Sequence, residues 1–477
     1  MKTQRSHLLT AGALLLATVL AGAATRGSGR SPSPAAPANG TTSFAAPASG
    51  TVSFTGKLDR SAVLRGDDGV AHMELVIGAA PDDRESNIRR PTDLVIILDR
   101  SGSMAGEKIE HARAAVRQLL EQLGPEDRFA LVTYADDAGI SVPLSSVDEL
   151  SREAWMEAIA GIQPDGSTNM ASGLDLGLNL IDGARAAGRV PHAVLISDGL
   201  ANQGDATPAG LARRAHRAAR GEYTLSTVGV GADFNEYLMS ALADAGTGNY
   251  YYLRNAEDLA GVLAREFNAT RTTVASGLTV QIQPAAGVHV VDAAGYPLEP
   301  AGDSVVFHPG SLFAGQERRI WVTLTVPHDT VGQYPIGTFA LLYGDGNSRR
   351  VASFTETPRI ACVASAEQFH SSVDVAAWSR SVVVDAYNKL QAEVAQDVQA
   401  GHRDEAMQRL REFKKTTADE NRYFASPPVA ALDGTVDALE ADVEQSFQGP
   451  NQAQRQNELS KSASAAAVDA RRAGSKQ

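Results

Sequence analysis

Apolar residues in the central part of the chain follow two patterns that alternate along the sequence. Between residues 91 and 268, four apolar runs predict buried strands: LVIILD, RFALVTYA, HAVLISD and TLSTVGVG. Between these runs, apolar residues recur every three or four positions, as on one face of a helix. The first such face is formed by Ile109, Ala112, Val116, Leu119 and Leu123. Strand–helix alternation predicts an α/β domain with a doubly wound, mostly parallel sheet and helices on both faces.

The regions on either side of this domain show the two-residue alternation of half-buried strands. In residues 51–90 the alternation includes Val52 and Phe54. In residues 269–365 it is clearest between Ile320 and Val326, and Pro- and Gly-containing turns recur along this region. We expect residues 269–365 to form a β-sandwich module. We further expect residues 51–90 to complete it, so that the α/β domain at 91–268 is an insertion.

The sequence of the C-terminal region predicts helices followed by a disordered end. Residues 366–447 contain three apolar stripes at helical spacing, separated by Gly401 and by Pro427-Pro428. Residues 448–477 are rich in Gln, Ser and Ala, and residues 24–50 are rich in Ala, Pro, Ser and Gly. Both segments are poor in the large apolar residues that a core needs. We expect a disordered tail and a disordered linker there.

The first residues have the features of an export signal. Residues 1–23 contain Lys2 and Arg5, an apolar run and then the small residues Ala21, Gly22 and Ala23, a pattern typical of a secretory signal peptide. An uncleaved anchor is the alternative, but the run is short for a span of about 20 residues. We expect no transmembrane segment in the mature chain and a periplasmic, cell-envelope or extracellular location.

The net charge disfavours some classes of partner, and the cysteine content excludes a disulfide. The formal net charge is −13, which disfavours nucleic acid or an anionic membrane surface as the main partner. The single cysteine, Cys362, excludes an internal disulfide. Its apolar surroundings favour a buried cysteine in a strand over a reactive thiol.

Three separated loops contain oxygen-bearing side chains in an order that indicates a metal site. DRSGSM supplies Asp99, Ser101 and Ser103, DGSTNM supplies Thr168, and LISDGLAN supplies Asp198. The first and third loops follow strand-like runs, where ligands of parallel sheets bind. Hydroxyl and carboxylate oxygens suit a hard cation, so we expect Mg²⁺, with Mn²⁺ as a substitute. Calcium sites usually use more ligands and more carboxylates.

These segments resemble the metal-ion-dependent adhesion site of von Willebrand factor type A domains, and the likeness extends from about residue 91 to 267. The wider order of segments is similar to bacterial secreted relatives of the inter-alpha-trypsin inhibitor heavy chains. The resemblance implies that Ser101 and Ser103 bind the metal directly and that Thr168 binds directly or through water. Asp99 and Asp198 would act mostly through water, and a partner's Asp or Glu would complete the coordination. In some relatives the last helix of the domain shifts when ligand binds, and the corresponding helix here lies around 258–267.

The predicted function is therefore exported, metal-dependent binding or adhesion to a protein ligand. A scaffold with a structural metal is one alternative, and a metal-dependent hydrolase is another. HExxH and GxxxxGK[ST] motifs are absent, and no recognisable Ser–His–Asp order accompanies the motif. We therefore expect no enzyme and no catalytic residues.

Several polar residues near the motif receive simpler interpretations. Asn169 is expected to cap the next helix. Asn202 and Asp205 either border the site or are solvated loop residues. A basic helix face is expected to be solvated, and it consists of Arg213, Arg214, Arg217 and Arg220.

Overall fold

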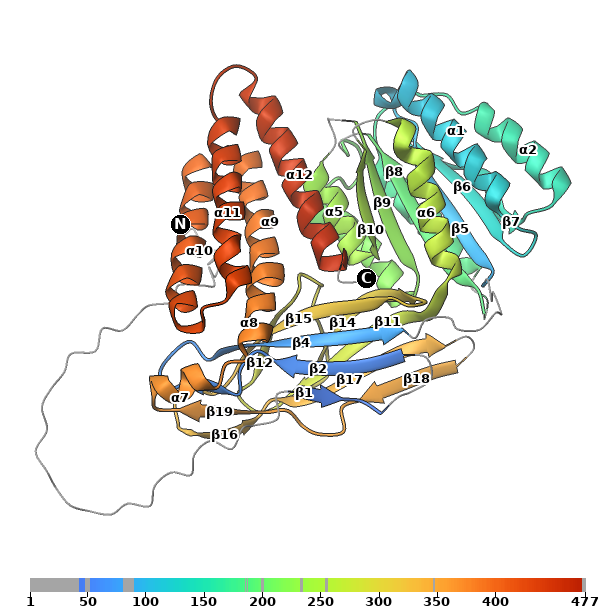
Figure 1. The fold of residues 1–477 in the computed structure, drawn as a ribbon. Coiled ribbons are helices and arrows are strands. Elements are labelled where there is room, and N and C mark those ends of the chain that lie inside the picture. The colour runs from blue at the N-terminus through green and yellow to red at the C-terminus, as the bar shows by residue number, and fades with distance from the viewer. Residues whose placement is uncertain are drawn as a thin grey trace, which may run out of the picture.

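The computed structural model describes residues 43–47, 52–79, 90–184, 186, 188–198, 201–231, 235–253, 256–345 and 348–473. The signal peptide expected at 1–23 lies outside these residues. The chain forms an α/β domain, a β-sandwich beneath it and a group of long helices beside it (Figure 1). In the described part of the chain, no helix combines the length and apolar character that crossing a membrane requires.

A six-stranded sheet forms the centre of the α/β domain, in the order β10-β9-β8-β5-β6-β7. Its strands are β5 (Thr92–Asp99), β6 (Arg128–Tyr134), β7 (Ala138–Ser146), β8 (Val190–Ser197), β9 (Thr224–Val230) and β10 (Thr247–Leu253). Neighbouring strands are parallel except β6 and β7. The predicted mostly parallel sheet is confirmed. Strand order reverses between β5 and β8, the position where α/β sheets bind ligands.

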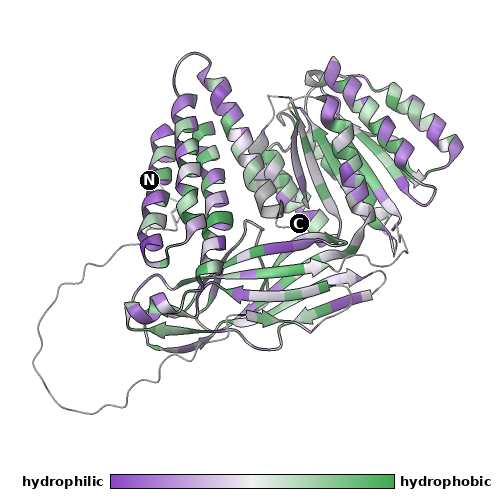
Figure 2. Cartoon of the chain, in the orientation of Figure 1, coloured by the Kyte–Doolittle hydropathy of each residue, from purple (hydrophilic) through white to green (hydrophobic). Residues whose placement is uncertain are grey.

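Helices cover both faces of this sheet. One layer contains α1 (Glu107–Gln122), α2 (Glu149–Ala160) and α6 (Leu259–Arg271), and the other contains α3 (Met170–Gly183), α4 (Pro208–Arg220) and α5 (Glu236–Ala245). Strand β5 presents Ile96 to the first layer and Ile97 to the second. Every residue of β5 is buried, because both of its faces are covered. Figure 2 shows the strands of this sheet as largely hydrophobic and the helices as mixed.

The sandwich combines strands from both sides of the α/β domain. One sheet has the order β1-β2-β4-β15-β12, the second has the order β13-β14-β11-β17-β18, and a small third sheet has the order β16-β19-β3. Before the α/β domain come β1 (Ser43–Ala45), β2 (Val52–Leu58), β3 (Ala62–Leu64) and β4 (Val70–Ala79). After it come β11 (Thr273–Pro284), β12 (His289–Ala293), β13 (Glu299–Ala301), β14 (Ser304–Phe313), β15 (Glu317–Thr325), β16 (Gly332–Pro335), β17 (Gly337–Asp345), β18 (Ser348–Ser353) and β19 (Arg359–Val363).

Strand β4 pairs with β15 from Val70 opposite Thr325 to Gly78 opposite Glu317. The α/β domain therefore interrupts the sandwich in the sequence. Whether the α/β domain and the sandwich fold as independent units stays a prediction. Cys362 is buried in β19 and forms no disulfide.

The expected linker at 24–50 is wrong for residues 43–47. Here β1 pairs antiparallel with β2. Phe44 is only 7% exposed, and its ring lies 6.1 Å from that of Phe354. The buried ring of Phe44 and backbone hydrogen bonds from Ala46 to Phe54 and from Thr355 to Ala45 hold this three-residue strand at the sheet edge, although the composition around it is that of a linker.

Apart from its first helix, the helical region packs around a common apolar core. Phe369 of that first helix packs against Ala62, Ala361 and Val363 of the small sheet. It contains α7 (Ala366–Ser371), α8 (Val375–Arg380), a π-helical segment η3 (Ser381–Ala386), α9 (Tyr387–Gln399), α10 (Arg403–Phe424) and α11 (Pro427–Ser446). Gly401 follows α9 with φ +79°, a conformation that favours glycine. Ser426 caps α11, which begins at the predicted Pro-Pro boundary.

The expected disordered tail at 448–477 is wrong over most of its length. Residues 452–473 form α12 (Gln452–Ala473), which packs against α9 and α5 and so links the helical region to the α/β domain (Figure 1). Ala463 and Ala467 on this helix are buried. Alanine has a high helix propensity and permits close helix packing, but it produces no large apolar stripe in the sequence.

Candidate functional site

The strand order brings two of the predicted loops together. Asp99 is the last residue of β5, and Asp198 follows the last residue of β8, the parallel neighbour of β5. A short 3-10 helix, η1 (Gly102–Met104), turns the chain after β5 and places Ser103 beside Asp198. The two aspartates are buried because they lie at the strand ends, under the loops that follow.

Hydrogen bonds connect four of the five predicted residues. Ser103 Oγ donates to Asp198 Oδ1 at 2.8 Å, and Ser101 Oγ lies 3.0 Å from Ser103 Oγ. Because the Ser103 hydroxyl proton is directed at Asp198, Ser101 is the donor in the second contact. The Ser101 backbone N–H donates to Asp99 Oδ1 at 2.8 Å. Ser103 is exposed, whereas Asp99, Ser101 and Asp198 are buried.

Asp99 is held by donors from the neighbouring strands. Its Oδ2 accepts a hydrogen bond from Ser197 Oγ at 2.7 Å and a longer one from Tyr134 OH at 3.4 Å. Burial raises the pKa of Asp99, the bonds from Ser197 and Ser101 lower it, and the Asp198 carboxylate raises it again, for a net increase. A cation at this position would favour the ionised form of Asp99.

Thr168 reaches the site through backbone contacts of its loop. The Gly102 N–H donates to the Gly166 carbonyl at 3.0 Å, which joins the first and second loops. Gly166 has φ +70°, and a Cβ there would lie 2.6 Å from Asp136 Oδ2, so this position requires glycine. Thr168 itself is buried, with 3% exposure.

Asn202 contacts the Thr168 loop of the candidate site, although the sequence left its role open. Its Oδ1 accepts from the Thr168 N–H at 2.9 Å, and its own N–H donates to the Thr168 carbonyl at 3.1 Å. This reciprocal pair fixes the second loop against the third. Asn202 closely follows Asp198 in the sequence, and that proximity was the available signal.

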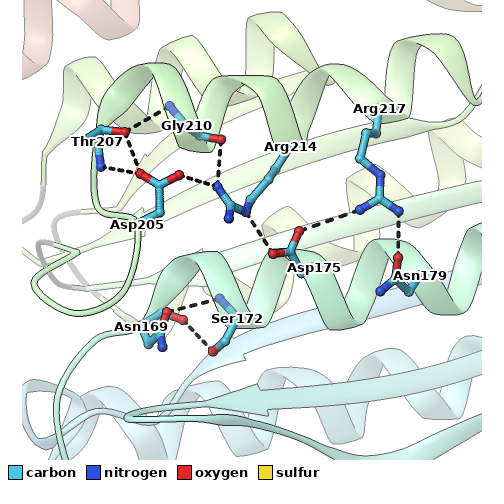
Figure 3. Close-up of polar contacts among 9 residues, drawn as sticks. All are labelled: Asn169, Ser172, Asp175, Asn179, Asp205, Thr207, Gly210, Arg214 and Arg217. Carbon is cyan, nitrogen blue, oxygen red and sulfur yellow. Dashed lines mark hydrogen bonds and ion pairs between the residues drawn. The ribbon is translucent and has the colours of Figure 1, made fainter.

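Polar contacts join α3, α4 and the loop that precedes α4 (Figure 3). Asn169 caps α3 by accepting from the Ser172 N–H, as predicted. Arg214 donates to Asp205 at 2.7 Å and to Asp175 at 2.9 Å. Hydrogen bonds from Thr207 and then from Arg214 lower the pKa of Asp205 to about 2.

The expectation of a purely solvated basic face on α4 is therefore wrong for two of its members. Arg214 pairs with Asp205 and Asp175, and Arg217 donates to Asn179 and Asp182 on α3 at 2.7 and 2.8 Å. The carboxylates that pair with these arginines lie on another helix or in a loop. Periodicity within α4 alone could not reveal them.

Lys108 was missed by the sequence analysis. It lies in the first turn of α1, and its Nζ donates to Asp198 Oδ2 and, at 3.2 Å, to the Ser103 carbonyl. A positive charge near the start of a helix is unfavourable because the helix dipole is positive there. Its position was therefore the one signal in the sequence that Lys108 has a specific acidic partner.

The oxygen atoms present fit a small hard cation. Two neighbouring ligands in an octahedral Mg²⁺ shell, with bonds of about 2.1 Å, lie about 3 Å apart. The hydroxyl oxygens of Ser101 and Ser103, the two residues expected to bind the metal directly, are 3.0 Å apart. Among the described residues, no group of three or more His, Cys, Asp or Glu could hold a metal. The candidate site relies on hydroxyls instead.

Comparisons with known proteins agree with this architecture. The family model described as von Willebrand factor type A domain matches residues 93–265. Escherichia coli (strain K12) YfbK is 32% identical over 203 residues, which cover 42% of this chain and 35% of that protein. Human inter-alpha-trypsin inhibitor heavy chain H4 is 29% identical over 162 residues, which cover 32% of this chain and 17% of that protein. The matches thus span about a third or less of these relatives.

A solved structure described as von Willebrand factor type A from Catenulispora acidiphila has the same fold. It aligns with 91% of this chain and 98% of its own chain, with a TM-score of 0.64 and 17% identity. The sheet order, the loops at its switch point and the matched family model lead to one conclusion: this chain contains a von Willebrand factor type A domain, at residues 93–265.

Proposed function

We propose that this chain is an exported, divalent-metal-dependent binding protein that captures a protein ligand through an Asp or Glu carboxylate. The observation that carries the proposal is the pair of hydroxyls of Ser101 and Ser103, whose oxygens, 3.0 Å apart, have the spacing of neighbouring ligands in an octahedral shell, beside the buried carboxylate of Asp198. Ser103 is exposed, so the same position is open to a partner.

The five predicted residues would share the work of holding the cation. Ser101 and Ser103 would be direct ligands, Thr168 a ligand that binds directly or through water, and Asp99 and Asp198 would orient bound water. When bound, Mg²⁺ supplies an electrophilic position for an incoming carboxylate. Because the direct ligands are neutral hydroxyls, they leave the cation's charge largely uncompensated, which favours an anionic partner.

The hydrogen bonding of the two carboxylates supports ligand capture over catalysis. Both carboxylates of the site already accept hydrogen bonds, Asp99 from Ser197 and Ser101 and Asp198 from Ser103 and Lys108. Neither is therefore positioned as a free general base. The alternative is a scaffold role, in which the metal only stabilises the fold. An experiment must distinguish this role from capture of a carboxylate.

The test uses Mn²⁺ as a paramagnetic substitute and acetate as a carboxylate probe. The full chain is loaded with Mn²⁺, and the relaxation of the acetate methyl protons is measured, with methanesulfonate as an anion of the same charge. We expect enhanced relaxation of acetate with the parent chain and its loss in Ser103→Ala. Bound Mn²⁺ without selective enhancement would favour the scaffold role, and no Mn²⁺ binding by the folded chain would refute the proposed site.

A further inference from the structure

Lys108 places a positive charge inside the candidate metal site. Its Nζ contacts Asp198 Oδ2 and the Ser103 carbonyl, with the lysine side chain 31% exposed and the Asp198 side chain fully buried. Asp198 Oδ1 accepts from Ser103 at 2.8 Å. Both oxygens of Asp198 are thus committed, one to a hydroxyl and one to an ammonium group.

The end of β9 is shaped to accept this lysine. Gly231 follows β9 with φ +87°, and its N–H donates to the Leu253 carbonyl at 2.8 Å. A Cβ at Gly231 would lie 3.3 Å from Lys108 Cε and 3.5 Å from Nζ. The aliphatic part of Lys108 therefore lies against the backbone of Gly231, where a larger residue would crowd it.

The charges of the site set up a competition. Asp99 and Asp198 contribute two negative charges, and Lys108 offsets one of them. A divalent cation that uses Asp198, directly or through water, must share or displace the ammonium group. If Lys108 stays nearby, the loaded site has one positive charge in excess, which a single carboxylate from a ligand would neutralise.

We propose that Lys108 is an internal competitor of the divalent cation: it weakens metal binding to the free protein and so makes tight binding depend on a ligand's carboxylate. This inference rests on the metal-dependent function proposed above. Lys108 is in this sense a positioning and tuning residue, because it acts through Asp198.

The test is a calorimetric titration of the metal-stripped full chain with Mg²⁺. Lys108→Met should bind Mg²⁺ about tenfold more tightly than the parent, the effect of removing one ion pair to a buried carboxylate. Lys108→Arg keeps the charge and should remain closer to the parent. Arg117→Met is the matched control, since it removes a positive charge from the same helix about 13 Å further along its axis.

The outcomes separate this inference from the proposed function. If neither the parent nor Lys108→Met binds Mg²⁺ while both remain folded by circular dichroism, the proposed metal site is wrong. Equal affinities of the two, or weaker binding by Lys108→Met, would overturn the competitor role and leave the metal site standing. An equal gain in Arg117→Met would reduce the effect to net charge and also overturn it.

The carboxylate dependence has its own readout. In the Mn²⁺ relaxation assay, Lys108→Met should hold acetate less tightly than the parent, because the loaded site no longer has an excess positive charge. Unchanged or tighter acetate binding in this variant would refute that part of the proposal.

Discussion

A buried carboxylate on α6 provides the sharpest test of how the last helix of the α/β domain is held. Glu266 is 3% exposed. Its Oε2 accepts from Ser226 Oγ at 2.5 Å and lies 3.0 Å from His192 Nε2. Its Oε1 accepts from Asn249 Nδ2 at 2.6 Å and from Tyr251 OH at 2.5 Å. The network joins α6 to β8, β9 and β10.

The contribution of this network to the free energy of folding follows from the pKa shift of Glu266. Burial alone would raise the pKa of Glu266, but His192, Ser226 and Tyr251 outweigh it and lower the pKa from 4.5 to about 2. A lowered folded-state pKa contributes stability above the unfolded-state value, and that contribution is lost as the pH falls towards the folded-state value. The shift corresponds to about 3 kcal/mol at neutral pH.

We therefore predict that Glu266→Gln weakens the docking of α6 by about 3 kcal/mol, which corresponds to roughly hundredfold faster hydrogen exchange in this helix. Hydrogen exchange with mass spectrometry on peptides from residues 259–271 of the full chain measures this. Glu110→Gln, at an exposed position on α1, is the control and should leave α6 unchanged.

The pH dependence supplies the refutation. The ratio of exchange rates between Glu266→Gln and the parent should shrink as the pH falls from 4.5 to about 2, because the parent then loses its ionised carboxylate. A ratio that stays below about tenfold at neutral pH, or that does not change with pH, would show that this network does not hold α6. A movement of α6 on ligand binding, like the helix shift of some relatives, would have to break these contacts.

Three further predictions concern the site and the architecture. Asn202→Ala should weaken Mg²⁺ binding about tenfold with unchanged circular dichroism, because it frees the Thr168 loop; unchanged affinity would remove Asn202 from the site. Mg²⁺ at about a hundred times its dissociation constant should stabilise the parent by about 2.7 kcal/mol in thermal unfolding, reversibly with a chelator, and should not stabilise Ser103→Ala. A fusion of residues 51–90 to 269–365 should give the circular dichroism of a folded β-sandwich, and an unfolded product would contradict the insertion.

The sequence predicted those parts of the fold whose residues act through local periodicity. The apolar run of β5 predicted a fully buried strand because both faces of a parallel sheet are covered. Asp99 and Asp198 were identified by their place in the motif, which agrees with the strand pattern because parallel strands end at the same edge of the sheet. The role of the five residues as metal ligands stays a prediction.

The missed features depend on contacts between distant segments. Lys108 and Glu266 look like ordinary charged residues on helices, and only the fold shows Lys108 beside Asp198 and Glu266 among buried donors. Phe44 and α12 were missed because neither produces a run of large apolar residues. Side chains that are buried by a partner far away in the sequence leave little local signal.

The pairing of β4 with β15 has a consequence for the order of folding. All strands of the α/β sheet lie between Thr92 and Leu253. In contrast, β4 pairs with β15, which begins only at Glu317, so the two strands are separated by the whole α/β domain in the sequence. Arg90 at the entrance to the α/β domain donates to the Val274 carbonyl just after its exit, at 3.4 Å. Folding of the α/β domain therefore brings the two ends of the interrupted sandwich together and removes most of the loop that β4 and β15 would otherwise have to close. We expect the α/β domain to fold first, so that a substitution slowing its folding also delays the sandwich.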